Sequence, residues 1–296
     1  SWVRYEYDGQ GRTIKEITPW LDATPGTVAS SAREVAYDYT SQDSSDDMTP
    51  EDNRKPRLVT ERILGQTVAK TFYVYQINNG QRTNIVERAA RTNANYGDPD
   101  NLRTTTVLVS GSPWRVLNVT HPDGQRDSYT YETGSYTPNS DPAQPGTFTA
   151  GAGTNERETV LHGTAATPAG VAFKTGSERL VRNSIGQVLL EERFVYNGSS
   201  SPLVAWTVTR YDELGHAAFV HQSDGTRSEH TWNESALQEE SDRAGTLHRY
   251  TYDAIGRLLT RVKEAGTNDV TATYSYDAAG RRLSETVTSS SLTMNA

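Results

Sequence analysis

The chain has 296 residues, a formal net charge of −8, no cysteine and only 34% hydrophobic residues. Without cysteine there can be no disulfides, thiolate metal sites or cysteine nucleophiles. The basic residues are dispersed, unlike those of nucleic-acid-binding proteins, and no apolar stretch approaches the roughly 20 residues of a membrane helix. We therefore expect no nucleic-acid partner and no membrane span.

The first element predicted along the chain is a β-hairpin near the amino terminus. Tyr5 and Tyr7 alternate with the period of a strand, so both lie on one face. Asp8 and Gly11 follow, and aspartate is favoured at the first corner of a type I turn while glycine takes a left-handed conformation cheaply. The chain opens inside this unit, which predicts a piece of a longer polypeptide.

The region after the first hairpin alternates between strands and irregular stretches. We predict a long acidic loop near 41–56, solvated along its run of aspartates, and a longer strand region from Arg57 to Tyr75. A second long loop is predicted near 136–155, where prolines and glycines gather, and a milder irregular segment runs from His162 to Ser177. Trp20 and Trp114 lie in the less regular surroundings of this first half.

From Leu180 onward the hairpin signals become dense. The same aspartate-to-glycine turn recurs at Asp212 and Gly215, Asp253 and Gly256, and Asp277 and Gly280. The aromatic residues that precede successive repeats (Tyr211, Trp232, Tyr252 and Tyr276) are separated by 21, 20 and 24 residues, with a second turn signal near each midpoint. Turns about every ten residues indicate an antiparallel β-meander.

Catalytic and metal-binding signals are weak in this sequence. His216 and His221 are five residues apart, which places them on opposite faces of a regular strand and favours ordinary strand residues over a metal pair. Asp98 and Asp100 lack the full spacing of a calcium loop. No nucleophile elbow or phosphate-cradling glycine motif occurs, so we expect no catalytic residue, metal or cofactor.

The rows of tyrosines have two interpretations. They stack on one another across strands, which stabilises a sheet by roughly 0.2–1 kcal/mol per pair, or they present rings to sugars and partner proteins. Their occurrence at equivalent points of every repeat favours packing. Trp20 and Trp114 are the better candidates for ligand contacts.

The residues from Tyr252 to Leu258 and from Tyr276 to Leu283 resemble the YD repeat, also called the Rhs repeat, in which Tyr-Asp is followed by two variable residues and Gly-Arg. The segment from Tyr7 to Arg12 matches this pattern up to Thr13, where the aliphatic residue that ends the repeat is missing. The segment from Tyr211 to His216 replaces the arginine with histidine. The resemblance covers the last third of the chain and the amino terminus, with degenerate copies between them.

The resemblance implies bacterial Rhs proteins, insecticidal toxin-complex subunits and teneurins, in which a ribbon of hairpins forms a hollow shell around a toxin or other domain. It implies a secreted or cell-surface protein, and the lack of cysteine favours a bacterial one. The self-cleavage site of many family members has no recognisable counterpart before Ala296, so that activity is not carried over.

We therefore expect an all-β, strongly curved antiparallel hairpin-repeat sheet, part of a YD-repeat shell, over residues 1–296. The expected function is structural and non-catalytic, the encapsulation or display of a cargo. Its expected partners are flanking repeats or a cargo domain of the same polypeptide, together with self-association through sheet edges. The alternatives are a glycan-binding or adhesive module that uses exposed aromatics, and a glycosidase embedded in a β-propeller, whose blades need periods near 40–45 residues.

Overall fold

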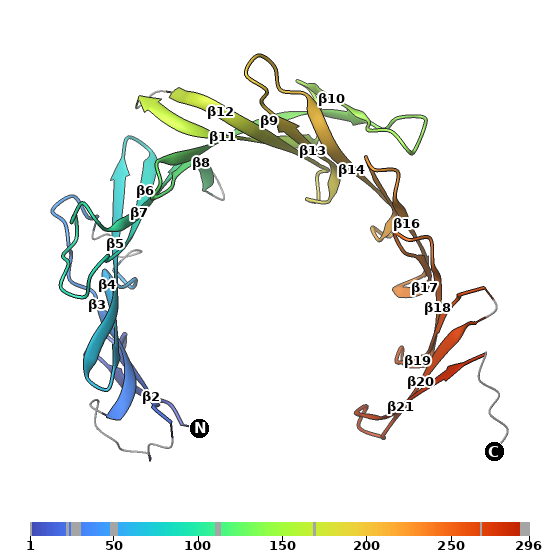
Figure 1. The fold of residues 1–296 in the computed structure, drawn as a ribbon, viewed down its shortest axis with the longest axis horizontal. Coiled ribbons are helices and arrows are strands. Elements are labelled where there is room, and N and C mark those ends of the chain that lie inside the picture. Colours follow the sequence, from blue (N-terminus) through green and yellow to red (C-terminus); the bar gives the residue numbers. More distant parts are fainter. Residues whose placement is uncertain are drawn as a thin grey trace. The chain divides into compact units, whose positions relative to one another are not determined.

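The computed structural model describes residues 2–21, 24, 31–47, 53–109, 114–167, 170–266 and 268–290. Across these residues the chain forms 21 β-strands that belong to a single open antiparallel sheet, and no α-helix occurs among them. Figure 1 shows β16 to β21 of the second unit following one another in chain order. The prediction of an all-β antiparallel hairpin sheet is confirmed.

The strands are mostly between four and nine residues long, with four longer ones of 13 residues. Their bounds are β1 Arg4–Tyr7, β2 Thr13–Pro19, β3 Ala32–Asp38, β4 Leu58–Ile63, β5 Gln66–Asn78, β6 Gln81–Arg88, β7 Leu102–Val109, β8 Arg115–Thr120, β9 Gln125–Thr137, β10 Thr147–Ala150, β11 Asn155–Thr167, β12 Gly170–Arg182, β13 Val188–Val195, β14 Leu203–Tyr211, β15 Ala217–Gln222, β16 Arg227–Asn233, β17 Ala236–Ser241, β18 Leu247–Tyr252, β19 Leu258–Lys263, β20 Val270–Tyr276 and β21 Arg282–Ser289.

Strand pairing is that of a meander, in which nearly every strand pairs with the strand before it and the strand after it. The exception is β9, which pairs with both β10 and β11. Many hairpins carry a register shift beside the turn, as between Thr251 and Tyr252 and between Ser275 and Tyr276. Such a bulge is where an Asp-to-Gly turn re-enters the strand.

The chain divides into two compact units. The first consists of residues 1–129 and 161–175, and the second of residues 130–160 and 176–296. In the first unit Ile17, Phe72 and Val74 are among the few fully buried apolar side chains. In the second, Val181, Leu190 and Val208 form a small cluster, against which Tyr136, Phe148 and Trp206 pack. The low hydrophobic content of the sequence thus corresponds to small, local cores.

The stretch near 136–155, predicted as a long loop, includes the whole of β10, which pairs with β9 so that Phe148 lies opposite Tyr136. The interpretation of the segment from His162 to Ser177 as irregular is wrong, because it lies almost entirely in β11 and β12. Threonine, valine and phenylalanine suit extended strands, and β-branched content outweighed the glycines there.

The acidic segment near 41–56 is predicted as a solvated loop, and residues 48–52 of it lie outside the described residues. Within the described part, Asp46 is fully buried and its carboxylate lies 2.5 Å from the Arg57 guanidinium, which is also fully buried. Asp46 also accepts the backbone N–H of Tyr75 at 2.9 Å. The prediction that this aspartate is solvated is therefore wrong. The loop lies along the part of β5 that extends beyond β4, and Tyr75 of β5 provides its backbone partners.

Two hairpins of the first unit use a different turn. Leu64 and Gly65 join β4 to β5, and Asn79 and Gly80 join β5 to β6, all four with positive φ. Consecutive positive φ values define the type I′ turn, which matches the twist of the flanking strands. The Asn-Gly pair is a recognised sequence signal for this turn, whereas leucine at positive φ is not.

Candidate functional site

The repeated feature of the molecule is a turn in which one aspartate satisfies several backbone groups. In the repeat at Asp253, Oδ1 of its carboxylate accepts the backbone N–H of Ile255 at 3.0 Å and that of Arg257 at 2.9 Å. The other oxygen accepts Nε of the Arg257 guanidinium at 2.6 Å. Gly256 closes the turn at φ 82° and donates its N–H to the Asp253 carbonyl.

The same geometry recurs at the other predicted turn residues. Asp8 binds Arg12 Nε at 2.7 Å, Asp277 binds Arg281 Nε at 2.7 Å, and Asp212 binds His216 Nδ1 at 3.0 Å. The glycines at these turns all have positive φ: Gly11 76°, Gly215 88° and Gly280 82°. An uncharged version, Asn183 with Gln187, makes the equivalent side-chain contact at 2.6 Å.

These contacts lower the pKa of the turn aspartates. At Asp253, Asp277 and Asp8 the largest cause is the backbone N–H of the arginine four residues later, reinforced by the guanidinium of the same arginine. At Asp212 burial is the largest cause and opposes the change, but hydrogen bonds from His216 outweigh it and the pKa is still lowered. Each carboxylate is thus held in its charged form.

A second contact joins each repeat to the one before it. The Tyr276 hydroxyl donates to the Leu258 carbonyl at 2.8 Å, and Leu258 lies two residues after the glycine of the preceding turn. The corresponding donors and acceptors elsewhere are Tyr252 and Leu237 at 2.9 Å, Trp232 and Ala217 at 3.0 Å, Tyr211 and Val188 at 3.0 Å, and Tyr39 and Thr13 at 2.8 Å. We call this contact the aromatic joint.

The cation of one turn covers the aromatic ring of the next repeat at several of these joints. The Arg257 guanidinium lies 5.0 Å from the centre of the Tyr276 ring and also donates to the Asp277 carbonyl at 3.3 Å. Arg12 lies 4.2 Å from the Tyr39 ring. Where histidine replaces arginine, His216 stacks on Trp232 at 4.7 Å. The arginine therefore connects its own turn to the following ring and turn.

The joint uses one fixed register. Between β19 and β20, Thr260 lies opposite Thr273. Continuing this pairing places Arg257 opposite Tyr276, and the Tyr276 hydroxyl donates to Leu258, the next residue along the chain. The same single-residue offset holds for the other four joints, between β17 and β18, β15 and β16, β13 and β14, and β2 and β3. The aromatic donor of each joint is thus compatible with one register between neighbouring hairpins.

The tyrosine pairs lie in strands, and one pair shows directly that its two side chains share a face of the sheet. The rings of Tyr5 and Tyr7 are 6.4 Å apart and tilted by 34°. The predicted ligand contacts are placed separately: Trp20 follows β2 and is 38% exposed, and Trp114 precedes β8 and is 37% exposed. Since β2 and β8 are not neighbours in the sheet, the two indoles do not form one site through strand pairing.

Several polar clusters of the first unit have no local sequence signal. Asp127 accepts hydrogen bonds from His121 at 2.9 Å and His162 at 2.7 Å, and these lower its pKa although burial, the largest cause, opposes them. The buried Glu87 accepts from Gly97, Asn101 and Arg103. The partners lie 6 to 35 residues apart, so the folded arrangement of strands and loops brings them together and their spacing in the sequence does not predict the contacts.

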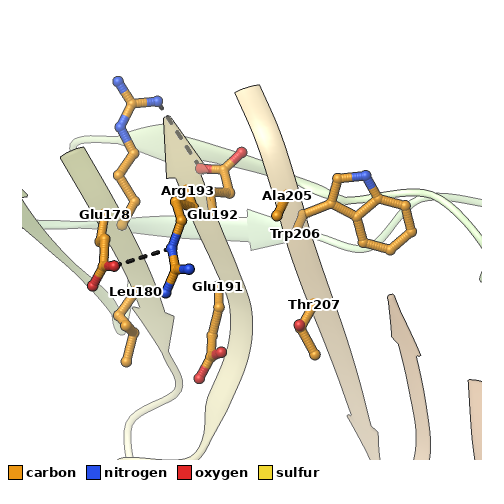
Figure 2. Close-up of a pocket in the computed structure, with 9 residues that line it drawn as sticks. Glu178, Leu180, Glu191, Glu192, Arg193, Ala205, Trp206 and Thr207 are labelled. Carbon is orange, nitrogen blue, oxygen red and sulfur yellow. Dashed lines mark hydrogen bonds and ion pairs between the residues drawn. The ribbon is translucent and has the colours of Figure 1, made fainter. Parts of the chain in front are cut away.

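A pocket of about 340 Å³ lies over β12, β13 and β14 (Figure 2). Its ion pairs join Arg193 to Glu178 at 3.1 Å and Arg179 to Glu192 at 4.0 Å. Burial, the largest cause, raises the pKa of Glu192 although the neighbouring arginines oppose it. Glu178 and Glu192 each face an arginine, and Glu191 also lines the pocket, so the pocket offers polar contacts on an open strand surface.

Metal and membrane signals are also absent from the described ranges. Within them, no group of three or more His, Asp or Glu side chains is arranged to hold a metal ion. Asp98 and Asp100, considered as calcium ligands, instead contact Arg91 at 3.4 and 3.1 Å. Among the described residues no helix is long and apolar enough to span a membrane.

No family model matches this chain, and no curated protein matches it. Among solved structures it is similar to a Photorhabdus luminescens Tc holotoxin pore with a mutation in TccC3, at 14% identity and a TM-score of 0.34. It is also similar to TcdB2-TccC3 without the hypervariable C-terminal region (16%, 0.36) and to TcdB2-TccC3 (16%, 0.31). Each match covers 96% of this chain, which spans 15%, 15% and 17% of those chains respectively.

Proposed function

We propose that this chain is a non-catalytic structural repeat module that forms part of a β-shell for the encapsulation or display of a cargo domain. The observation that carries the proposal is the aromatic joint, which fixes one hairpin onto the next at five places with one register. A contact that is repeated along the chain is typical of an extended repeat sheet rather than of a single reactive centre.

The use of the tyrosine hydroxyls supports this structural role. At the joints Tyr39, Tyr211, Tyr252 and Tyr276 donate to backbone carbonyls of the neighbouring repeat. A hydroxyl engaged in this way donates its proton within the sheet, and removing it would deprive the carbonyl of this donor. The repeat tyrosines therefore hold neighbouring hairpins of the sheet together.

The sequence resemblance supplies the finer part of the proposal. YD-repeat proteins enclose toxins or other domains, and on that basis we propose a secreted or cell-surface bacterial setting, with flanking repeats or a cargo as partners. Small local cores and a polar surface are compatible with a wall that contacts its cargo without a continuous apolar face.

Protection of an attached segment tests the proposed enclosure. An unfolded reporter with a single protease site is fused after residue 296 and its cleavage rate is followed. The control is the same reporter fused to a globular carrier of equal mass. We expect several-fold slower cleavage on this chain. Equal rates would contradict enclosure, as would a hydrolase activity abolished by one side-chain substitution.

The glycan-binding alternative keeps one favourable observation, the partial exposure of Trp20 and Trp114. Exposed indole rings stack on sugars as well as on protein groups. The two functions separate on a glycan array with the wild-type chain, Trp20→Ala and Trp114→Ala. Binding that disappears in either variant would favour the glycan-binding module, whereas no binding by the wild-type chain leaves the structural role as the better account.

A further inference from the structure

A second pocket of the second unit differs in character from the one in Figure 2. It has a volume of about 450 Å³ and is lined by the end of β9 and the residue after it, the turn between β12 and β13, the start of β13, and the end of β14 with the turn that follows. The two pockets share no lining residue. A volume of this size lies within the range of about 300–1,000 Å³ that is typical of small-molecule sites.

One side of this pocket is apolar and continuous with the small core of the second unit. Pro138, Leu189 and Val208 line it. Val208 is 2% exposed and belongs to the core cluster, against which the Tyr136 ring packs. Because packing in the core fixes these side chains, the apolar side of the pocket is formed before any ligand arrives.

Two hydrogen-bond donors that line the pocket are buried and have no acceptor. The Tyr136 hydroxyl and Nε of Arg210 find no hydrogen-bond acceptor within the described residues. Arg210 is nevertheless held in place, because its Nη2 donates to the Asn139 carbonyl at 2.8 Å. A buried donor without an acceptor is costly, and such groups call for an explanation.

Other polar side chains of the pocket already have partners. The Asn183 amide donates to the Gln187 side chain at 2.6 Å, and Gln187 donates to the Gly215 carbonyl at 2.7 Å. The Asp212 carboxylate accepts the backbone N–H of His216 at 2.8 Å and its Nδ1 at 3.0 Å. The two donors without an acceptor are therefore the groups of this pocket that a ligand can satisfy.

The charges around the two donors favour a ligand with a single negative charge. Burial, the largest cause, raises the pKa of Tyr136, while the Gly146 N–H and the Arg210 charge oppose the rise, so Arg210 lies close enough to act on this hydroxyl. A carboxylate has two acceptor oxygens, one for each donor. A doubly charged phosphate is less suitable, because Asp212 also lines the pocket and would repel it.

We propose that this pocket binds a small carboxylate that carries a short branched apolar group. One carboxylate oxygen accepts the Tyr136 hydroxyl and the other accepts Nε of Arg210, while the apolar group lies against Leu189 and Val208. The site does not rest on the proposed enclosure, since all of its residues belong to the second unit.

The first test compares isovalerate with isovaleramide, which has the same shape without the charge. Binding to the full chain at neutral pH is measured by ligand-observed NMR titration. We expect saturable binding of isovalerate and about tenfold weaker binding of isovaleramide, because hydrogen bonds to a charged acceptor are the stronger ones. An absence of saturable isovalerate binding would show that solvent alone satisfies the two donors and would overturn the proposal, as would equal affinities.

The second test removes one donor and leaves its ring in place. Tyr136→Phe should weaken isovalerate binding at least about tenfold, whereas the same change in Tyr274→Phe, outside the pocket, should leave binding unchanged. In the absence of ligand, Tyr136→Phe should not lower the melting temperature, since the hydroxyl has no acceptor in the free protein. Full binding by Tyr136→Phe, or a clear loss of its stability without ligand, would contradict the proposed site.

A third probe identifies the source of the carboxylate. N-acetyl-leucine presents the same branched group and carboxylate as they occur at the end of a peptide chain. Tighter binding of N-acetyl-leucine than of isovalerate would assign the pocket to a chain terminus, and the reverse order would assign it to a free acid. Either order supports the site only if Tyr136→Phe weakens it. Failure of the reporter-protection experiment would leave these results unaffected.

Discussion

At the scale of single residues, the Asp-to-Gly turn assembles three functions in five positions. The aspartate satisfies two backbone N–H groups, the glycine takes a left-handed φ, and the arginine neutralises the carboxylate. Each function depends on atoms within the same turn. The turn is thus formed by local sequence and is compatible with different flanking strands.

The backbone conformation of Gly256 gives the first prediction. A Cβ at this position would meet no atom within 4 Å, but φ is 82°, which a β-branched residue adopts only with strain. Gly256→Val should therefore lower the free energy of unfolding by about 1–3 kcal/mol through strain alone. Gly9→Val is the control, since that site is equally open and its φ is not in the strained range. Urea unfolding measures both, and equal losses would contradict the turn assignment.

The turn carboxylates give a prediction about acid. Because the folded-state pKa of Asp253 is lowered, its contribution to stability is present above the unfolded value, near 3.9, and is lost as pH falls through the folded value. Replacing both Asp253 with Asn and Arg257 with Gln imitates the natural pair Asn183 and Gln187. This double variant should match the wild-type chain at pH 7 and lose less stability between about pH 5 and pH 3. Identical pH slopes would contradict the role of the charged pair.

At the scale of elements, the hairpin is held to its neighbour by the joint as well as by backbone pairing. Strand pairing alone tolerates a slip by two residues, which keeps each side chain on its face. The hydroxyl-to-carbonyl bond and the arginine that covers the ring specify one register among those possibilities. We infer that the joint prevents slippage in strands that are otherwise polar.

The joint predicts a measurable cost for losing one hydroxyl. Tyr276→Phe keeps the ring over Arg257 but leaves the Leu258 carbonyl without this donor, and should lower the free energy of unfolding by about 0.5–1.5 kcal/mol. Tyr274→Phe, on the same strand, makes the same chemical change outside the joint and should have a smaller effect. Chemical denaturation of both variants decides the point, and a larger loss in Tyr274→Phe would contradict the joint as a stabilising contact.

At the scale of the whole molecule, the described strands form a chain of nearest-neighbour contacts with small cores. Leu190 and Val208, each 2% exposed, lie in β13 and β14, whereas the side chains of β21 are exposed along nearly all of its length. In such arrays stability is close to a sum of local terms. Different parts of the ribbon should therefore open with different free energies.

Hydrogen exchange measured by mass spectrometry tests this expectation. Amides of β13 and β14 should be the most protected in the second unit, and those of β21 should exchange the fastest, because an exposed edge opens without uncovering a core. Equal protection of β13 and β21 would indicate one cooperative unit instead.

The positions of the turns could be read from sequence because their chemistry is local. Asp253 and Gly256 act within one turn, and the alternation of Tyr250 and Tyr252 follows from the period of a strand. Burial of Asp46 could not be read in the same way, since its partners Arg57 and Tyr75 lie 11 and 29 residues away. The composition of an acidic run is the same whether or not one of its side chains is buried against a strand.

The sequence by itself determined the antiparallel hairpin meander, because turn preferences and strand periodicity act over a few residues. Only the tertiary structure decided which carbonyl each tyrosine reaches, since the donor and acceptor of a joint lie 15 to 26 residues apart. That choice depends on the register between neighbouring strands, and register is an energy shared by whole strands rather than a property of any one residue.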